Sequence, residues 1–464
     1  MRKHVAPCLG WAFYMLSITI LTWNGFRAAE SALLAGEAAF SFSLVRLVLF
    51  SAVFFLGAYL AGRRSGPFSF ARTLGLGVGL LVVGGLPVLL TGFAPRWSII
   101  AGAGFIGSGS SVLFMLWQRA FSSRGSYATG FILVVASGLG VVLFLALSIV
   151  GFFGRPITMS VLAAVASAGM LLIVDRNAPP VARIRERPLG LKALLKDIWK
   201  PVLCVSAFGF VWQIVYALGL NSASISSVLQ NSFVLSQIVA SLVLGLAWFR
   251  FHEYVHIELV FQILFPLMAT GFLLMPFLGD EYRAAFISFS LFAFGAMSIL
   301  MQVASLQKSE RLRADPVVVV GVFAGFVYSA MTLGFVVGHF LPGGDTFGFA
   351  HLLVLALVLV YSLSAVFFAI KFRWRESRPS GQEGATGLDE RAGACGAVAR
   401  DAGLSARETE VFELIAKGRD LPYIADKLVV SKNTVRTHMK NIYTKLGVHS
   451  KQEVIDLVDA RRKR

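Results

Sequence analysis

The chain has 464 residues, a formal net charge of +17 at pH 7, and 56% hydrophobic against 14% charged residues. A soluble protein carries about 25% charged residues, so this composition excludes an ordinary water-soluble chain and predicts a polytopic membrane protein. The cysteines Cys8, Cys204 and Cys395 are odd in number and far apart. They predict neither a disulfide framework nor a metal site.

The first apolar run, residues 9–26, follows the basic residues Arg2 and Lys3, as the core of a secretory signal would. Many similar runs follow it, and no small-residue cleavage site stands behind it. We therefore expect a retained first span and not a cleaved signal.

Twelve runs reach the length that a bilayer core requires, about 20 residues. They lie near residues 9–26, 40–62, 74–94, 97–118, 128–153, 156–175, 201–220, 228–249, 256–279, 284–306, 317–341 and 347–371. The longest loop, residues 175–200, falls after the sixth run. We expect an all-α bundle of twelve helices, six in each half.

Basic residues gather in alternate loops. One set of loops carries Arg63, Arg64, Arg72, Arg119, Arg124, Arg176, Arg183, Arg185, Arg187, Lys192, Arg250, Lys308, Arg311 and Arg313. The other set carries few Lys or Arg residues. The positive-inside rule therefore predicts that both termini face the cytoplasm.

The loop after the second run contains a short motif. Its residues are Gly57, Leu60, Ala61, Arg63, Arg64 and Gly66, with Gly62 at an intervening position. This loop and the six-plus-six layout resemble the major facilitator superfamily, whose two halves are related by an axis along the membrane normal. The resemblance implies a transporter-like fold. Gly62 stands where that family has an acidic residue, which puts gating by this loop in doubt.

The end of the central loop has two chemically different faces. Leu191, Leu194, Leu195 and Ile198 share one helical face, and Lys192, Lys196 and Lys200 share the other. This pattern predicts either a basic amphipathic helix along the inner leaflet or a connector that only tethers the halves.

Ionisable residues are almost absent from the middle of the predicted spans. We expect Arg46, a third of the way into the second span, to extend toward the outer water layer, and binding of an anionic ligand is the alternative. His339 and His351 lie near the outer ends of the last two spans, where they are either interfacial residues or a pH or metal sensor. The lack of central carboxylates argues against a proton-coupled pump and favours sensing.

Several neutral polar residues also lie in the predicted spans. They either line a cavity or join neighbouring helices by hydrogen bonds. They are Asn24, Gln118, Gln213, Asn231, Gln237, Gln262 and Gln302.

The composition changes after the membrane module, which we place at residues 1–375. Residues 376–400 are rich in Gly, Ala, Ser and Pro, which predicts a flexible linker. Residues 401–464 then read as four short helices. Ser405 and Glu408 form a capping-box pattern that opens the first of them.

The second and third helices of this domain have clear start and stop signals. Pro422 begins a short helix that reaches Leu428, and Ser431 can cap a longer helix that Gly447 ends. Two helices joined by a turn of three or four residues predict a helix-turn-helix.

This segment resembles the LuxR-type, or NarL/FixJ-type, DNA-binding domain of bacterial regulators. The matching positions are Leu404, Arg407, Glu408, Glu410, Val411, Gly418, Ile424, Ala425, Leu428, Ser431, Thr434, Val435, His438, Ile442, Lys445, Leu446 and Val448. Phe412 stands where the family usually has Leu. The match covers about sixty residues and every helix of the predicted domain.

The resemblance implies which residues meet DNA. Arg436, Thr437 and Lys440 are implied at base edges, and Arg is the best side chain for bidentate reading of guanine. Phosphate contacts are implied for Ser431, Lys432, Asn433, Thr434 and Lys445. The family also dimerises through its last helix, here residues 450–460, on a two-fold promoter site.

These observations predict a membrane-embedded one-component transcriptional regulator in the bacterial plasma membrane. Its twelve-span module would sense an unidentified small molecule or a membrane state. A secondary transporter with a DNA-binding tail is the alternative, and a regulator released by proteolysis is a third interpretation. No nucleotide loop, catalytic triad or metal cluster is visible in the sequence, so we expect no enzyme, no catalytic residue, no metal and no cofactor.

Overall fold

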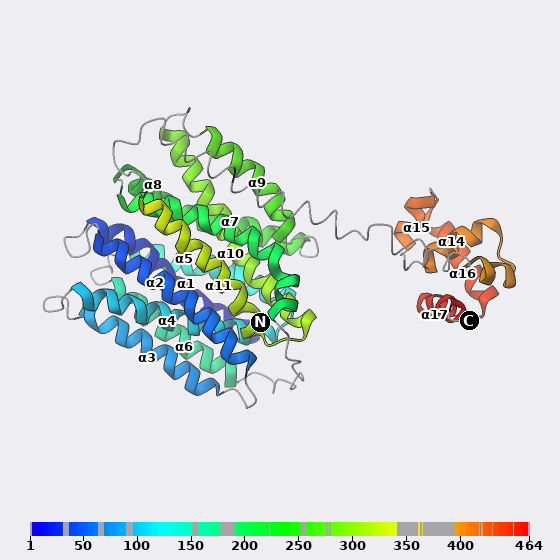
Figure 1. The fold of residues 1–464 in the computed structure, drawn as a ribbon, viewed down its shortest axis with the longest axis horizontal. Helices are drawn as coiled ribbons and strands as arrows, with labels where there is room; N and C mark the ends of the chain where they lie inside the picture. The colour runs from blue at the N-terminus through cyan, green and yellow to red at the C-terminus, as the bar shows by residue number, and fades with distance from the viewer. Residues whose placement is uncertain are drawn as a thin grey trace. The chain divides into compact units, whose positions relative to one another are not determined.

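The structure, a computed structural model, divides into two compact units, Met1–Phe368 and Ala369–Arg464 (Figure 1). We call them the membrane unit and the C-terminal unit. The residues described are 2–30, 37–63, 69–89, 96–150, 156–176, 191–221, 223–251, 257–274, 277, 280–340, 361, 364, 395–416, 418, 421–428, 430–448 and 450–462. Every regular element within these ranges is a helix, which confirms the predicted all-α class.

The membrane unit contains eleven helices among its described residues, side by side in one bundle (Figure 1). They are α1 (Arg2–Glu30), α2 (Glu37–Gly62), α3 (Phe70–Leu89), α4 (Arg96–Ser122), α5 (Ser126–Ile149), α6 (Pro156–Arg176), α7 (Leu191–Asn221), α8 (Ala223–Phe251), α9 (Ile257–Leu274), α10 (Asp280–Leu312) and α11 (Pro316–Phe340). Within the described ranges, nine are long and apolar enough to cross a membrane, and α3 and α9 hold shorter apolar stretches. The expected twelfth span, residues 347–371, lies outside the described residues except at Tyr361 and Ser364.

The two halves of the bundle meet through a few helix pairs. Within the first half, α3 packs on α4 and α1 packs on α6, and within the second half α7 packs on α8 and α10. Across the halves, α2 packs on α11 and α5 packs on α8. Because α11 also packs on α7, it contacts helices of both halves.

Small residues allow these helices to approach closely. A Cβ on Gly321 of α11 would lie 2.6 Å from the Phe54 carbonyl oxygen of α2, and one on Gly107 of α4 would lie 2.6 Å from the Arg46 carbonyl oxygen. Contacts this short are possible only for glycine. Such close backbone packing is the usual way that helices associate in a bilayer.

Two polar pairs also join α4 to the second half. Gln118 Nε2 donates to Gln302 Oε1 at 2.9 Å, and Arg119 forms a 3.3 Å ion pair with Asp315, just before α11. Asp315 Oδ1 also accepts from the backbone N–H of Val317 at 2.7 Å, which caps the start of α11. These pairs hold the halves together at this end of the bundle.

The end of the expected central loop is part of a long helix. Residues 191–200 are the first turns of α7, which continues through Pro201. Leu194 and Ile198 are buried, 1% and 0% exposed. This stretch is therefore continuous with α7 and not a separate helix, and its predicted apolar face is only partly covered by protein, since Leu191 is 60% exposed.

The C-terminal unit contains the four predicted helices. They are α14 (Ala406–Ala416), α15 (Leu421–Leu428), α16 (Lys432–Leu446) and α17 (Lys451–Arg462). The predicted capping box is present at the start of α14, where Ser405 N donates to Glu408 Oε2 at 2.8 Å and Glu408 N donates to Ser405 Oγ at 3.3 Å.

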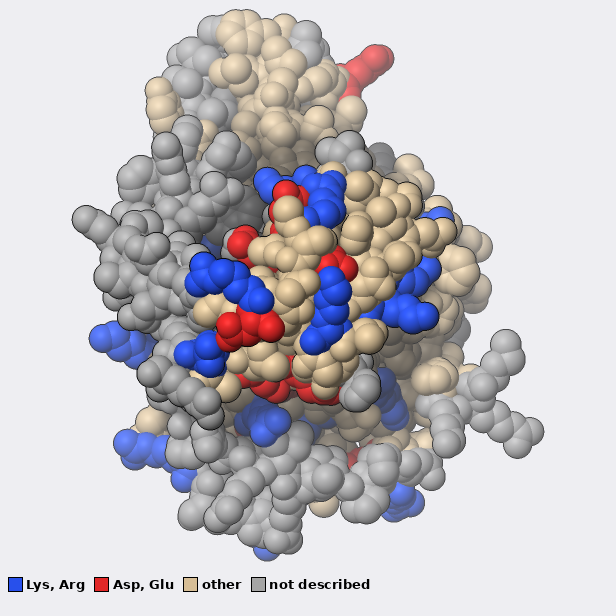
Figure 2. All heavy atoms as spheres, turned by 90° about the vertical axis from the view of Figure 1, so that its right-hand side faces the viewer, with Lys and Arg blue, Asp and Glu red and all other residues tan. Residues whose placement is uncertain are grey.

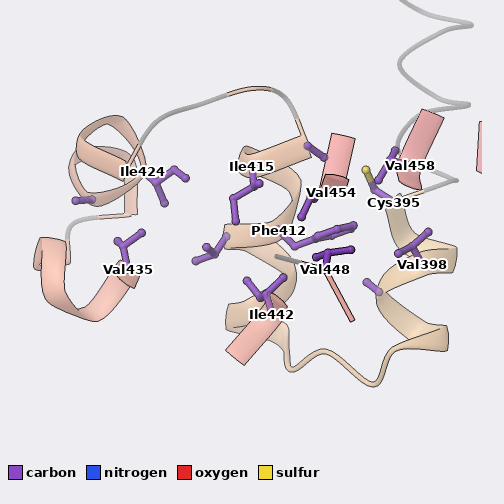
Figure 3. Close-up of a cluster of buried hydrophobic side chains, with 14 residues drawn as sticks. Cys395, Val398, Phe412, Ile415, Ile424, Val435, Ile442, Val448, Val454 and Val458 are labelled. Carbon is purple, nitrogen blue, oxygen red and sulfur yellow. The ribbon is translucent and has the colours of Figure 1, made fainter. Parts of the chain in front are cut away.

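One core holds these helices together, with Phe412 at its centre (Figure 3). Val435 and Ile442 of α16 and Val454 and Val458 of α17 are each 0% exposed. Each helix contributes its buried stripe to the same cluster. This unit therefore has a hydrophobic core of its own.

The folded domain begins earlier than residue 401. Residues 395–401 are helical, and Cys395, Val398 and Ala399 are buried in the core (Figure 3). The expected flexible linker, residues 376–400, therefore does not extend over residues 395–400. Cys, Val and Ala at helical spacing form a narrow apolar stripe, which the surrounding Gly and Ala residues obscure in the sequence.

Candidate nucleic-acid interface

The turn between α15 and α16 is closed by local hydrogen bonds. Val430 N donates to Ala425 O at 3.0 Å. Ser431 then takes extended backbone angles, and its Oγ accepts from Thr434 N at 3.1 Å, which is the predicted N-cap. At the other end of α16, Gly447 adopts φ 65°, a left-handed conformation that ends the helix as predicted.

The two faces of α16 differ sharply. Val435 and Ile442 are completely buried, whereas Arg436, Thr437 and Lys440 are all exposed. The structure therefore brings the three residues expected at base edges together on the outer face of one helix. An exposed helix face of this kind fits the width of the DNA major groove.

Asn433 organises this outer face from within the same helix. Its side-chain Oδ1 accepts from Arg436 Nη1 at 3.2 Å, and its backbone carbonyl accepts from Thr437 Oγ1 at 3.1 Å. The guanidinium is thus oriented before any ligand arrives. Asn433 was expected only as a phosphate contact, so this orienting role was missed.

Four of the five expected phosphate contacts lie at the N-terminal end of α16. Ser431, Asn433 and Thr434 are exposed, and Ser431 Oγ lies 2.8 Å from Thr434 Oγ1. Lys432 is the first residue of the helix, and its side chain lies outside the described part of the chain. Free backbone N–H groups and the helix dipole favour an anion at this end.

Lys445 lies elsewhere and is already paired. It is near the C-terminal end of α16, about 20 Å along the axis from Lys432. Its Nζ donates to Glu408 Oε2 at 2.8 Å and to Gly403 O at 3.1 Å. The structure thus separates Lys445 from the other four candidates and gives it a bond that fastens α16 to α14.

Glu408 is the buried partner of that ion pair. The residue is 5% exposed, and its carboxylate accepts from Lys445 Nζ and from Ser405 N. The Lys445 hydrogen bond, followed by the Ser405 backbone hydrogen bond, lowers the pKa of Glu408 to about 2 against the effect of burial. The sequence pattern showed only the capping role of Glu408.

Arg407 fixes the position of α15. Its Nη2 donates to the carbonyl oxygen of Leu428, the last residue of α15, at 2.9 Å, and its other nitrogen Nη1 pairs with Glu410. Because α16 starts four residues after Leu428, this bond helps set the angle at which α16 is presented. Arg407 matched the family pattern, but its contact could not be read from spacing.

The charge of the C-terminal unit is mixed. From Asp401 onward there are thirteen Lys and Arg and nine Asp and Glu residues. Basic and acidic side chains lie beside one another on the face seen in Figure 2. Arg461 Nη2, for example, lies 2.8 Å from Asp401 Oδ2. The thirteen basic and nine acidic residues leave this stretch with a net charge of only +4.

The last helix, α17, divides its residues between the core and the surface. Val454 and Val458 are 0% exposed, while Gln452, Glu453 and Asp456 are exposed. The expected dimer helix, residues 450–460, is thus folded onto its own domain by one stripe. Its opposite stripe remains on the surface.

The two histidines predicted near the outer ends of the last spans show no metal site within the described part of the chain. His339 of α11 stacks on Phe40 of α2 with ring centroids 3.7 Å apart, and His351 lies outside the described residues. Within the described ranges, no three His, Cys, Asp or Glu side chains are grouped so that they could hold a metal ion.

The C-terminal unit is similar in sequence to known bacterial regulators. The family model for bacterial regulatory proteins of the luxR family matches residues 402–458. The oxygen regulatory protein NreC of Staphylococcus aureus (strain JH9) is 51% identical over 53 residues, which cover 11% of this chain and 24% of NreC. The chain thus spans about a quarter of the length of the curated relatives it matches.

Solved structures resemble the membrane unit, each over 80% of this chain. The proton:xylose symporter XylE has a TM-score of 0.56 at 13% identity over 95% of its chain. A bacterial homologue of the iron transporter ferroportin has 0.57 at 11% over 100%, and the human organic anion transporter MFSD10 has 0.52 at 14% over 99%.

At these identities the likeness shows the fold alone. The chain is a multi-pass membrane protein with the fold of the major facilitator superfamily, and it carries a LuxR-type helix-turn-helix domain at its C-terminus. Both resemblances drawn from the sequence are confirmed.

Proposed function

We propose that the protein is a membrane-embedded transcriptional regulator that binds promoter DNA through α16. The observation that carries this proposal is the two-faced structure of α16. Its outer face exposes Arg436, Thr437 and Lys440, while Val435 and Ile442 anchor its inner face in the core. A helix held in this way can enter a major groove without disturbing the domain that presents it.

The three outer residues have different chemical roles in this proposal. Arg436, oriented by Asn433, offers two parallel N–H groups to the O6 and N7 atoms of guanine. Thr437 supplies a methyl and a hydroxyl group one position further along. Lys440 brings a flexible charge that suits either a base edge or a phosphate.

Phosphates are held at the start of the same helix. Ser431, Lys432, Asn433 and Thr434 surround its N-terminus, where backbone N–H groups favour an anion. Lys445 is not among these contacts in the proposal, because its ammonium already lies on Glu408.

Binding occurs as a homodimer on a two-fold site. The exposed stripe of α17 is the surface through which two copies would associate, as the LuxR-type resemblance implies. Two weakly charged domains on two half-sites combine their affinities through a high effective concentration.

The protein lies in the bacterial plasma membrane with both termini in the cytoplasm. The basic residues in alternate loops support this orientation, and contact with chromosomal DNA requires it. The segment before residue 395 is rich in Gly, Ala, Ser and Pro. Such a composition favours control by proximity or docking over rigid transmission.

A gel-shift assay on residues 390–464 tests the DNA-binding step. The fragment contains the whole described core, including the helix at 395–401. We expect specific binding that Arg436→Ala weakens about tenfold or more, because one bidentate contact is worth about 1–3 kcal/mol. Arg400→Ala removes an equal charge from an exposed position outside α16 and serves as the control. A fragment that selects no promoter sequence with Arg436 intact would contradict the proposal.

A second candidate function is transport with a regulatory tail. The membrane unit contains a cavity lined by residues of both halves, as a transporter requires. Uptake or efflux of a labelled compound by the purified protein in liposomes separates this function from sensing alone.

A further inference from the structure

The membrane unit contains a central cavity with a volume of about 150 Å³. Side chains from both halves line it, including Trp11 of α1, Arg46 of α2, Ser137 of α5, Gln213 of α7 and Tyr328 of α11. A cavity of this volume holds about one aromatic ring. Its volume therefore suits a small molecule.

Arg46 is the one charged side chain among the described residues that line this cavity. Among the described residues, its guanidinium interacts with the ionisable side chains of Tyr14, Tyr216 and Tyr328. None of these groups is a carboxylate. Its Nε is buried and has no hydrogen-bond partner. The expectation that Arg46 extends toward outer water is therefore wrong, because its side chain turns into the bundle.

Four buried polar atoms without a hydrogen-bond partner line the same cavity. They are Trp11 Nε1, Arg46 Nε, Ser137 Oγ and Gln213 Oε1. Trp11, Ser137 and Gln213 are themselves 0%, 4% and 5% exposed. Native proteins rarely leave such groups unsatisfied, so each indicates a bound ligand or water.

The chemistry of these atoms favours an oxyanion. The indole N–H and the guanidinium N–H can only donate, and the serine hydroxyl can donate as well. Donors outnumber acceptors at this point, and a fixed positive charge lies among them. A carboxylate satisfies several donors at once and forms strong, charge-assisted bonds with Arg.

The remaining walls favour an aromatic body. Trp212 and Phe294 are stacked at 6.1 Å, and Phe50 lies against Tyr328 at 4.5 Å. All four rings line the cavity. Aromatic faces and edges of this kind pack well on another ring.

We propose that the central cavity binds a small aromatic monocarboxylate. Its carboxylate lies on Arg46 and its ring packs between aromatic walls from both halves. This assignment names the class of signal that the membrane unit senses. The role of the ligand as a signal rests on the proposed function. A ligand that touches both halves can also shift the balance between arrangements of the bundle.

Binding to the purified full-length protein in lipid nanodiscs tests the assignment. The probes are benzoate, phenylacetate and salicylate, with neutral benzamide and cationic benzylamine as matched counterparts of benzoate. Binding is followed by calorimetry and by the intrinsic tryptophan fluorescence, to which the cavity residues Trp11 and Trp212 contribute. We expect saturable binding of at least one carboxylate, with benzamide and benzylamine weaker by about tenfold or more.

Variants of Arg46 locate the contact. We expect Arg46→Gln to weaken carboxylate binding about tenfold or more and Arg46→Lys to restore part of it. Arg124→Gln is the matched control, because Arg124 Nε is also buried without a partner but does not line the cavity. Size-exclusion profiles and thermal midpoints check the folding of each variant. If Arg46→Gln fails to fold, the comparison of benzoate with benzamide on the unaltered protein decides.

Three results would overturn the assignment. They are the absence of saturable binding for all three carboxylates, equal affinity for benzoate and benzamide, and unchanged affinity in a folded Arg46→Gln variant. None of these measurements contains DNA, so their failure leaves the DNA-binding step intact. Conversely, carboxylate binding that does not alter promoter occupancy would support the ligand class and contradict its role as a signal.

Discussion

The two units of the molecule differ in whether a buried charge has a partner within the fold. In the C-terminal unit, the Glu408 carboxylate is buried and its partners, Lys445 and Ser405, come from the same domain. In the membrane unit, Arg46 Nε is buried and has no partner. Removing a charge from water is costly in both places and must be offset. A charge that the fold itself neutralises serves stability, while one that the fold leaves unneutralised is available to a ligand.

This difference also separates the functional cations of the two units. In the C-terminal unit, the basic residues proposed to act on DNA are the exposed ones, such as Arg436 and Lys440. Lys445 instead forms an ion pair with Glu408 that stabilises the fold. In the membrane unit, the proposed functional cation is the one that lies inside.

The largest expected effect is on the stability of the C-terminal unit. Glu408→Ala should lower its free energy of unfolding by about 3 kcal/mol, because Lys445 and the start of α14 both lose their partner. Denaturant unfolding of residues 390–464 measures this. Glu410→Ala, in an exposed pair with Arg407, should cost less than about 1 kcal/mol. Equal losses of unfolding free energy in Glu408→Ala and Glu410→Ala would contradict this difference between the buried and the exposed ion pair.

The same pair should make the domain sensitive to acid. Glu408 has a pKa of about 2 in the folded domain against 4.5 ordinarily. Because the folded value is lower, the stabilisation is fully present above about pH 4.5 and is lost as the pH falls toward 2. Linkage sets an upper limit of about 3 kcal/mol on it, which solvent screening at the partly exposed Lys445 reduces. The stability gap between the unaltered fragment and Glu408→Gln should therefore narrow steadily from pH 5 to pH 2.5, and a constant gap would contradict the pairing.

Arg46→Gln should act in the opposite direction. We expect it to raise the free energy of unfolding of the membrane unit by about 1 kcal/mol, because functional sites often retain groups that destabilise the fold. Thermal unfolding in detergent should show a midpoint about 1–2 °C higher. Benzoate should stabilise the unaltered protein and not this variant. A large loss of stability would mean that the fold already neutralises Arg46.

An effect of similarly small size is expected at the start of α16. Ser431→Ala removes the side-chain cap on Thr434 N and should cost about 1 kcal/mol in domain stability. Ser431→Asn keeps a capping group and is the control. Chemical denaturation measures the loss, and gel shifts at matched folded concentration report any separate loss of DNA affinity. Equal stability of the two variants would show that the cap contributes nothing.

Sequence reasoning succeeded where the signal is local. The helix starts at Ser405 and Ser431 and the stop at Gly447 depend on residues within one turn, so spacing alone predicted them. The apolar runs likewise predicted the helices of the membrane unit, because the length of a span is set by the bilayer. The predicted fold class followed from these short-range patterns, and the observed helices and the similar solved structures confirm it.

It failed where the answer depends on a distant partner. The ion pair of Lys445 was missed because its partner, Glu408, lies 37 positions away in the chain. Arg46 was expected to reach outward because the rotation of α2 within the bundle is set by its neighbours and not by its own sequence. Cys395 was expected in the linker because the small residues around it showed no clear alternation of apolar and polar positions.

The backbone that carries Arg46 is itself held by an uncharged contact. Gly107 of α4 packs so tightly on the Arg46 carbonyl that a single added methyl group would meet it at 2.6 Å. A residue with no functional group therefore sets the depth at which the guanidinium sits. Selectivity in this molecule could consequently be retuned from the neighbouring helix, with every polar group of the site left unchanged.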